Sequence, residues 1–278
     1  MNQTKMVGLA RFAYSQQIPA RLSQPVYAST SLLLCQSHKL TTNQIQPVSP
    51  FRSGEVRPRS FLIDLAIYLS LMFLIREFYF SSVSFIINGL FWSLATLAFA
   101  TWRMKARGIS WSDLGLRKPK NIKTTIAATL AILGMAIGFM IVFQVLIDQL
   151  KPGLAPDTSN DTAGNKFGNL KNNWLLFLSI VPAIWLESCI EEMLDRGFLI
   201  NWIERIFSGG LFATVLAVVL QAMIFGFRHS NDLSERSITV GLIGLAMGIG
   251  YVACGRNLWP LIIAHCILNT MSMVDRVV

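Results

Sequence analysis

The 278-residue sequence predicts an all-α fold, a polytopic transmembrane helical bundle with a buried polar active site. Charged residues make up only 14% of the chain, against about 25% in ordinary soluble domains. Apolar residues, 53% of the total, fall into blocks long enough to cross about 30 Å of hydrocarbon as helices. The ionisable side chains that do enter these blocks gather in the C-terminal half, which indicates one polar centre within the membrane.

About seven membrane spans are expected, and flanking charges leave six to eight open. The apolar segments cover residues 61–80, 83–102, 124–148, 174–200, 211–228, 238–254 and 258–274. Before them, residues 1–57 form a disordered or targeting leader, because they hold no acid before Glu55 and too few apolar residues to bury a core. Residues 58–123 are expected to form a transmembrane hairpin with a basic cytoplasmic loop, and residues 124–278 the transmembrane core, which carries the motifs at 187–272.

The net charge of +9 indicates membrane topology, and no nucleic-acid partner is expected. Lys and Arg crowd residues 1–60 and 101–123, which flank apolar blocks, and such excess marks the cytoplasmic side. The 149–173 loop is then expected on the far side, as is the C-terminus if there are seven spans. The protein is thus predicted to be a multi-pass integral protein of a lipid bilayer. A bacterial inner membrane is favoured, with an organelle membrane as the alternative because the acid-free start resembles a transit peptide.

Ionisable side chains inside the predicted spans are the strongest functional signal. Each costs at least about 2.5–3.5 kcal/mol on insertion, so their presence calls for a reason. They can pair merely to hold helices together, but adjacent carboxylates and partners on separate spans favour a functional centre. The group, with the amide that accompanies it, comprises Glu187, Glu191, Glu192, Asp195, Arg196, His229, His265 and Asn269.

Helical spacing divides this group into faces. Glu192 and Arg196 are four residues apart, so the guanidinium can neutralise that carboxylate within the bilayer. Glu191 lies on the neighbouring face and is left free as the chemical candidate. His265 and Asn269 are again four apart, so both can face the same site.

Helix lengths predict that His229 lies at the same level as Glu191. The break at Ser208–Gly210 lies about midway between Glu191 and His229. If both flanks are helical, each residue is about 27 Å from the bend, at a rise of about 1.5 Å per residue, and the two face each other. This requires the fourth helix to continue to about Arg205, and His265 reaches the same depth only under that condition.

Three motifs in order carry a family resemblance. The pattern resembles the signature of the CPBP intramembrane proteases, which include CAAX prenyl endopeptidases and the bacteriocin-related Abi proteins. The resemblance covers about residues 174–272, and Trp111–Arg117 is similar to a short stretch that often precedes the family core. The motifs read Glu191-Glu192-x-x-x-Arg196-Gly197, Phe225-x-x-x-His229 and His265-x-x-x-Asn269, the last preceded by Leu258-Trp259-Pro260.

The resemblance implies an endopeptidase that hydrolyses peptide bonds of a membrane-associated protein or peptide. Glu191 would act as general base, with His229 holding the same water, and His265 with Asn269 would donate hydrogen bonds to the oxyanion. No cofactor is expected. The catalytic set is then Glu191, Glu192, Arg196, His229, His265 and Asn269.

Other interpretations of these residues remain open. Glu191, His229 and His265 are an acceptable three-ligand zinc set, although the chain has neither an HExxH nor a CxxC motif. A non-catalytic membrane scaffold or a bacteriocin self-immunity protein is the main alternative function. A proton-coupled transporter would also use intramembrane carboxylates, but an internal repeat is expected there and none is found.

Two residues depart from the family pattern. Asp195 stands where an aromatic residue is usual, and Glu187 adds a further carboxylate one turn before Glu191. Either could repel Glu191 or draw Arg196 away from Glu192.

Overall fold

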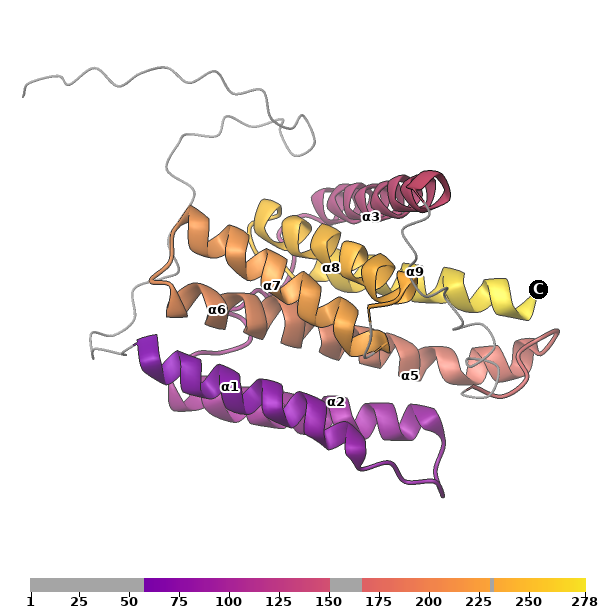
Figure 1. Cartoon of the computed structure of the whole chain (residues 1–278), viewed down its shortest axis with the longest axis horizontal. Coiled ribbons are helices and arrows are strands. Elements are labelled where there is room, and N and C mark those ends of the chain that lie inside the picture. Colours follow the sequence, from indigo (N-terminus) through magenta and orange to yellow (C-terminus); the bar gives the residue numbers. More distant parts are fainter. Residues whose placement is uncertain (1–57, 151–166, 231–232) are drawn as a thin grey trace, which may run out of the picture. The chain divides into compact units, whose positions relative to one another are not determined.

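The computed structural model describes residues 58–150, 167–230 and 233–278, so the predicted leader at 1–57 lies outside the described residues. The described part is helical and contains no strand, as predicted (Figure 1). Its long helices are α1 (Pro58–Leu74), α2 (Phe85–Ala106), α3 (Ile122–Leu150), α5 (Trp174–Glu192), α7 (Leu211–Ser230), α8 (Glu235–Ala253) and α9 (Trp259–Val277). Shorter helical pieces are η1 (Ile75–Glu77), η2 (Met193–Ile200) and α6 (Asn201–Ile206).

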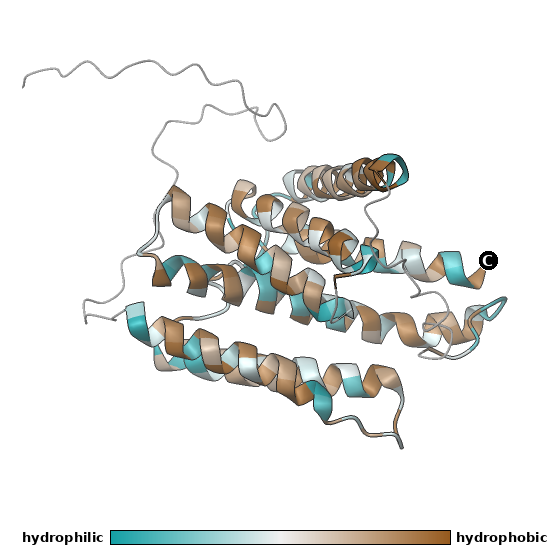
Figure 2. Cartoon of the chain, in the orientation of Figure 1, coloured by the Kyte–Doolittle hydropathy of each residue, from teal (hydrophilic) through white to brown (hydrophobic). Residues whose placement is uncertain are grey.

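Six helical stretches of the described residues are long and apolar enough to cross a membrane, within the predicted range. They are Pro58–Glu77, Phe85–Ala106, Ile122–Leu150, Trp174–Ile206, Leu211–Ser230 and Glu235–Ala253. The last predicted span, α9, is not among them, because His265, Asn269, Asp275 and Arg276 interrupt its apolar sequence. Figure 2 shows how widely apolar residues are spread along the helices, and exposed Leu, Ile and Val side chains such as those of α3 suit a lipid environment.

One long helical rod and the hairpin after it position the site. α5, η2 and α6 run without interruption from Trp174 to Ile206, and a turn then leads into α7. Ser208, Gly209 and Gly210 in this turn all have positive φ, which makes the sharp reversal possible. The predicted hairpin is therefore confirmed. η2 is π-helical and begins directly after Glu192, and such wider turns often occur at functional sites.

The remaining helices surround this hairpin. α8 packs along α7, α9 along α5, and α3 against both α8 and α9, while α1 contacts α6 and α2 contacts α5 (Figure 1). Gly226 and Gly244 allow the close approach of α7 and α8: a Cβ at Gly226 would meet the Ser237 carbonyl, and one at Gly244 would meet the Phe225 ring. α7 is thus held firmly at the level where it carries His229.

The stretch Trp111–Arg117, which resembles the family's upstream segment, contacts the turn between α8 and α9. Leu258 N donates to Gly115 O at 3.0 Å, and Tyr251 Oη donates to Leu114 O at 2.7 Å. Gly115 has φ of 107°, and a Cβ there would collide with the Arg256 carbonyl. This loop therefore fixes the start of α9, the helix that carries His265.

Candidate active site

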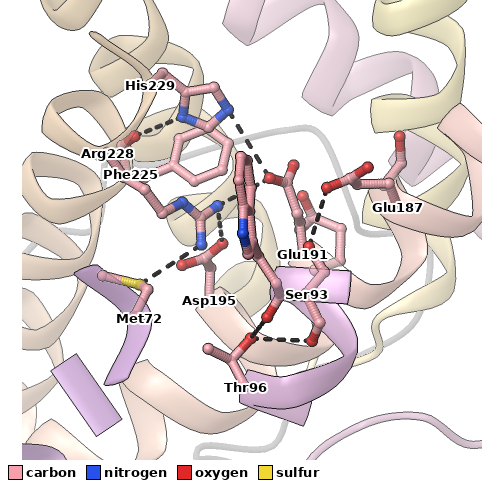
Figure 3. Close-up of polar contacts among 12 residues, drawn as sticks. Met72, Ser93, Thr96, Glu187, Glu191, Asp195, Phe225, Arg228 and His229 are labelled. Atoms are coloured by element: carbon pink, nitrogen blue, oxygen red, sulfur yellow. Dashed lines mark hydrogen bonds and ion pairs between the residues drawn. The ribbon is translucent and has the colours of Figure 1, made fainter. Parts of the chain in front are cut away.

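Polar side chains from separate helices meet beside α5 and η2. The carboxylates lie on α5 and η2. The Arg228 guanidinium and the His229 imidazole lie at the end of α7, and a second imidazole lies on α9. Figure 3 shows Glu191 linked to both Arg228 and His229, with Asp195 next to the same guanidinium and Glu187 turned toward Ser93. The polar residues predicted on separate spans thus gather in one place.

Glu191 occupies the middle of this group. Its Oε1 lies 3.9 Å from His229 Nε2, and its Oε2 lies 3.7 Å from His265 Nε2. Its side chain keeps 14% of its surface exposed, whereas Glu192 and Asp195 are completely buried. Of these three carboxylates, Glu191 is therefore the one that a water or a substrate can reach.

His229 is oriented by its own helix. Its Nδ1 lies 2.7 Å from the Phe225 carbonyl, which can only accept, so Nδ1 carries the proton and Nε2 faces Glu191. The imidazole also lies against the Phe225 ring, with 4.5 Å between centroids. Its side chain is 24% exposed, so His229 and Glu191 form the accessible edge of the group.

Glu192 and Arg196 form the ion pair that their spacing predicted, at 2.9 Å and fully buried. The same Glu192 Oε1 accepts a hydrogen bond from His265 Nδ1 at 2.7 Å. Arg196 also donates to the Gly244 carbonyl at 3.3 Å, and its guanidinium lies over the Phe225 ring at 4.5 Å. Glu192 therefore fixes the orientation of His265, and Arg196 holds Glu192 in place.

Asn269 is further from the centre than the other predicted residues. Its Nδ2 donates to Ser188 Oγ at 2.9 Å, which joins α9 to α5. Within the described residues, no hydrogen bond links Asn269 to Glu191, His229 or His265. The structure therefore places Asn269 one turn beyond His265, as a contact between helices.

The two departures from the family pattern leave the Glu192–Arg196 pair intact. Asp195 does not draw Arg196 away, because its Oδ2 pairs with Arg228 at 3.0 Å. Glu187 is turned toward α2, where its Oε1 accepts from Ser93 Oγ at 3.0 Å. The expectation that either carboxylate could disturb this pair is wrong, since each has a partner of its own.

Arg228 is the residue of this site that the sequence analysis missed. One of its nitrogens, Nη2, lies 3.0 Å from Glu191 Oε1 and 3.0 Å from Asp195 Oδ2 (Figure 3). The signal was present: the fourth apolar segment holds four carboxylates and a single Arg, so further cations had to come from other spans. Arg228 directly precedes His229, and only 5% of its side-chain surface is exposed.

A metal would need ligands from the same group. One carboxylate and two imidazole nitrogens are donors that zinc accepts, and Glu191, His229 and His265 face one another. In the part of the chain that the structure describes, however, no three or more His, Cys, Asp or Glu side chains are arranged as a metal-binding group. The three-ligand zinc set therefore stays a prediction, which treatment with a chelator tests.

Comparison with known proteins supports the motif-based prediction. Neither the curated proteins nor the solved structures include a match to this chain. A family model described as type II CAAX prenyl endopeptidase Rce1-like matches residues 172–271, a range that contains all six predicted catalytic residues. The resemblance is thereby confirmed: the part of this membrane protein that carries the site is similar to the Rce1-like family of type II CAAX prenyl endopeptidases.

Proposed function

We propose that the protein is an intramembrane endopeptidase that hydrolyses peptide bonds of a membrane-associated protein or peptide. One observation carries the proposal: Glu191 is a partly exposed carboxylate beside the buried Glu192 and Asp195, and the Nε2 atoms of two imidazoles lie within 4 Å of its oxygens. The Rce1-like match over the same residues supports a protease at the level of the family.

Glu191 and His229 activate the attacking water. Glu191 accepts a proton from water while the water oxygen forms a bond to the peptide carbonyl carbon. Because His229 Nδ1 is held by Phe225, its Nε2 is free to accept a hydrogen bond from the same water. When the C–N bond breaks, the proton held by Glu191 passes to the leaving amine, which regenerates the carboxylate.

His265 is suited to stabilise the oxyanion. Its Nδ1 proton is directed at Glu192, so its Nε2 donates a hydrogen bond only when the ring is protonated. The neighbouring Glu192 carboxylate favours that cationic ring, which would place a charged donor where negative charge develops. Asn269 would contribute a second donor after its amide leaves Ser188.

The test is hydrolysis by the purified protein in detergent, with fluorogenic membrane-protein peptides and prenylated CAAX peptides as probes. Glu191→Gln should abolish cleavage and leave the fold intact, because the amide keeps the shape but cannot take a proton. Glu187→Gln is the matched control, since this carboxylate lies on the same helix face and contacts Ser93 instead of an imidazole. Equal cleavage by wild type and Glu191→Gln would disprove the mechanism.

A non-catalytic scaffold or self-immunity protein is the second candidate, and one contact favours it. Arg228 is ion-paired to Glu191 at 3.0 Å, and a carboxylate held by a guanidinium is a weaker base than a free one. Absence of cleavage of every probe by a folded wild-type protein would favour this candidate.

A further inference from the structure

One nitrogen atom of Arg228 donates hydrogen bonds to two carboxylates. Nη2 lies 3.0 Å from both Glu191 and Asp195, which are four residues apart on the same face of the rod. Its Nη1 lies 3.8 Å from the Met72 sulfur, a weak acceptor, and its Nε has no partner in the described structure. The guanidinium therefore divides one positive charge between two negative ones.

Asp195 is ion-paired with Arg228, and no other cation of the described residues forms an ion pair with it. It is completely buried, and its Oδ1 lacks a hydrogen-bond partner among the described residues. A buried carboxylate without a counter-ion is strongly unfavourable, so the ion pair with Arg228 is what keeps Asp195 ionised in this position. The negative charge of Asp195 offsets part of the stabilisation that Arg228 gives to the ionised Glu191 carboxylate.

Among the described residues, Arg228 is the one side chain that forms ion pairs with both Glu191 and Asp195. Arg76 of η1 donates to the Arg228 carbonyl at 2.5 Å and so faces α7. The remaining groups have other partners. Glu187 is hydrogen-bonded to Ser93, Glu192 contacts Arg196 and His265, and His229 is hydrogen-bonded to Phe225. The charged and titratable groups that face Glu191 are Tyr68, Arg76, Glu187, Glu192, Asp195, Arg228, His229 and His265.

We propose that Asp195 and Arg228 are a positioning pair, in which the negative charge of Asp195 offsets the positive charge of Arg228 and so keeps Glu191 able to accept a proton. This proposal rests on the proposed function and deepens it. It also gives a role to Asp195, the residue that departs from the family pattern. Neither residue acts on the substrate directly.

Two variants should shift the protonation of Glu191 in opposite directions. Asp195→Asn removes the competitor, so Arg228 holds Glu191 more tightly and the acid limb of the kcat/KM profile moves to lower pH. Asp195→Asn combined with Arg228→Gln removes both charges, and the limb moves to higher pH. Each shift should be about 1 pH unit or more, the usual effect of one opposite charge in contact. The single change Arg228→Gln is avoided, because it leaves Asp195 buried without a cation.

A second measurement does not depend on activity. Infrared titration of the purified protein follows the band of the protonated carboxyl group, and its absence in Glu191→Gln assigns it to Glu191. The midpoints should rise in the order Asp195→Asn, wild type, double variant. Glu204→Gln, which removes a buried carboxylate paired with Arg256 elsewhere, is the control and should leave the midpoint unchanged.

The outcomes separate the two proposals. The expected order of midpoints supports the positioning pair even if no peptide is cleaved, in which case only the proposed function fails. Identical midpoints in all three folded proteins would overturn the pair and reduce Asp195 and Arg228 to a structural contact. Size-exclusion profiles and unfolding temperatures establish that each variant is folded.

Discussion

Two buried ion clusters of this protein differ in how completely their buried polar atoms are hydrogen-bonded. The anchor cluster joins α1 to α2 and consists of Asp64, Arg103 and Arg107. Arg103 Nε donates to Asp64 Oδ1 at 2.9 Å, and Arg107 Nε donates to Oδ2 at 2.7 Å. Trp202 Nε1 lies 3.3 Å from the same Oδ2, and Arg107 also bonds Ser60. Both oxygens of this carboxylate are thus occupied.

The site cluster has the opposite balance, with more carboxylates than guanidiniums. It comprises Glu191, Glu192, Asp195, Arg196, Arg228, His229 and His265. Among the described residues, four of its buried polar atoms have no hydrogen-bond partner: Glu192 Oε2, Asp195 Oδ1, Arg196 Nε and Arg228 Nε. A fully paired cluster can only stabilise the fold. An under-paired one retains capacity for water, substrate or a proton, and the comparison therefore separates structural charges from chemical ones.

The largest effect that sharpens this comparison is expected for Arg196→Ala. The change leaves Glu192 charged and buried without its guanidinium, and breaking such a pair typically costs about 3–5 kcal/mol. The amount of monodisperse protein and the unfolding midpoint in detergent measure it. Arg196→Lys is the control, because it retains the charge and should lose less; equal stability of Arg196→Ala and wild type would contradict the assignment.

Asn269→Ala tests the edge of the site cluster. If its amide reaches the oxyanion, kcat should fall by about 10²–10³-fold, as when one oxyanion donor is lost, while measurable cleavage remains. Ser188→Ala is the matched control, because it removes the partner that holds the amide and leaves the amide itself in place. An equal loss in both variants would show that Asn269 is only a contact between α5 and α9.

Asp64→Asn should affect stability alone. Removing the charge weakens two charge-assisted hydrogen bonds, worth about 1.5–3 kcal/mol each, and Arg103 can turn partly to solvent because its side chain is 27% exposed. Unfolding measurements should show the loss, with cleavage per folded molecule unchanged. A large fall in the specific activity of the folded fraction would remove the distinction between the two clusters.

A chelator should have no effect under the proposed mechanism. Water is activated there by the Glu191 carboxylate and the His229 imidazole, so incubation with EDTA should leave cleavage at the wild-type rate. Loss of activity with restoration by added zinc would instead support the three-ligand alternative of Glu191, His229 and His265. The EDTA-treated and zinc-supplemented samples are compared at one protein concentration.

Much of the fold followed from residue spacing, and part of the site did not. The hairpin could be predicted because the Ser208–Gly210 break and two uninterrupted apolar runs fix both helix lengths. Glu192–Arg196 could be predicted because both residues lie on one helix. Arg228 was missed because spacing within a helix cannot say which carboxylate a cation on another helix will meet.

The contact between Gly115 and Leu258 sets the axial position of α9. The first turn of this helix is attached to a loop remote in sequence through the 3.0 Å hydrogen bond from Leu258 N. A slip of one residue along the helix axis would move His265 by about 1.5 Å. Such a movement is more than half the 2.7 Å that separates its Nδ1 from Glu192, so this loop fixes the reach of the imidazole as firmly as the residues that touch it.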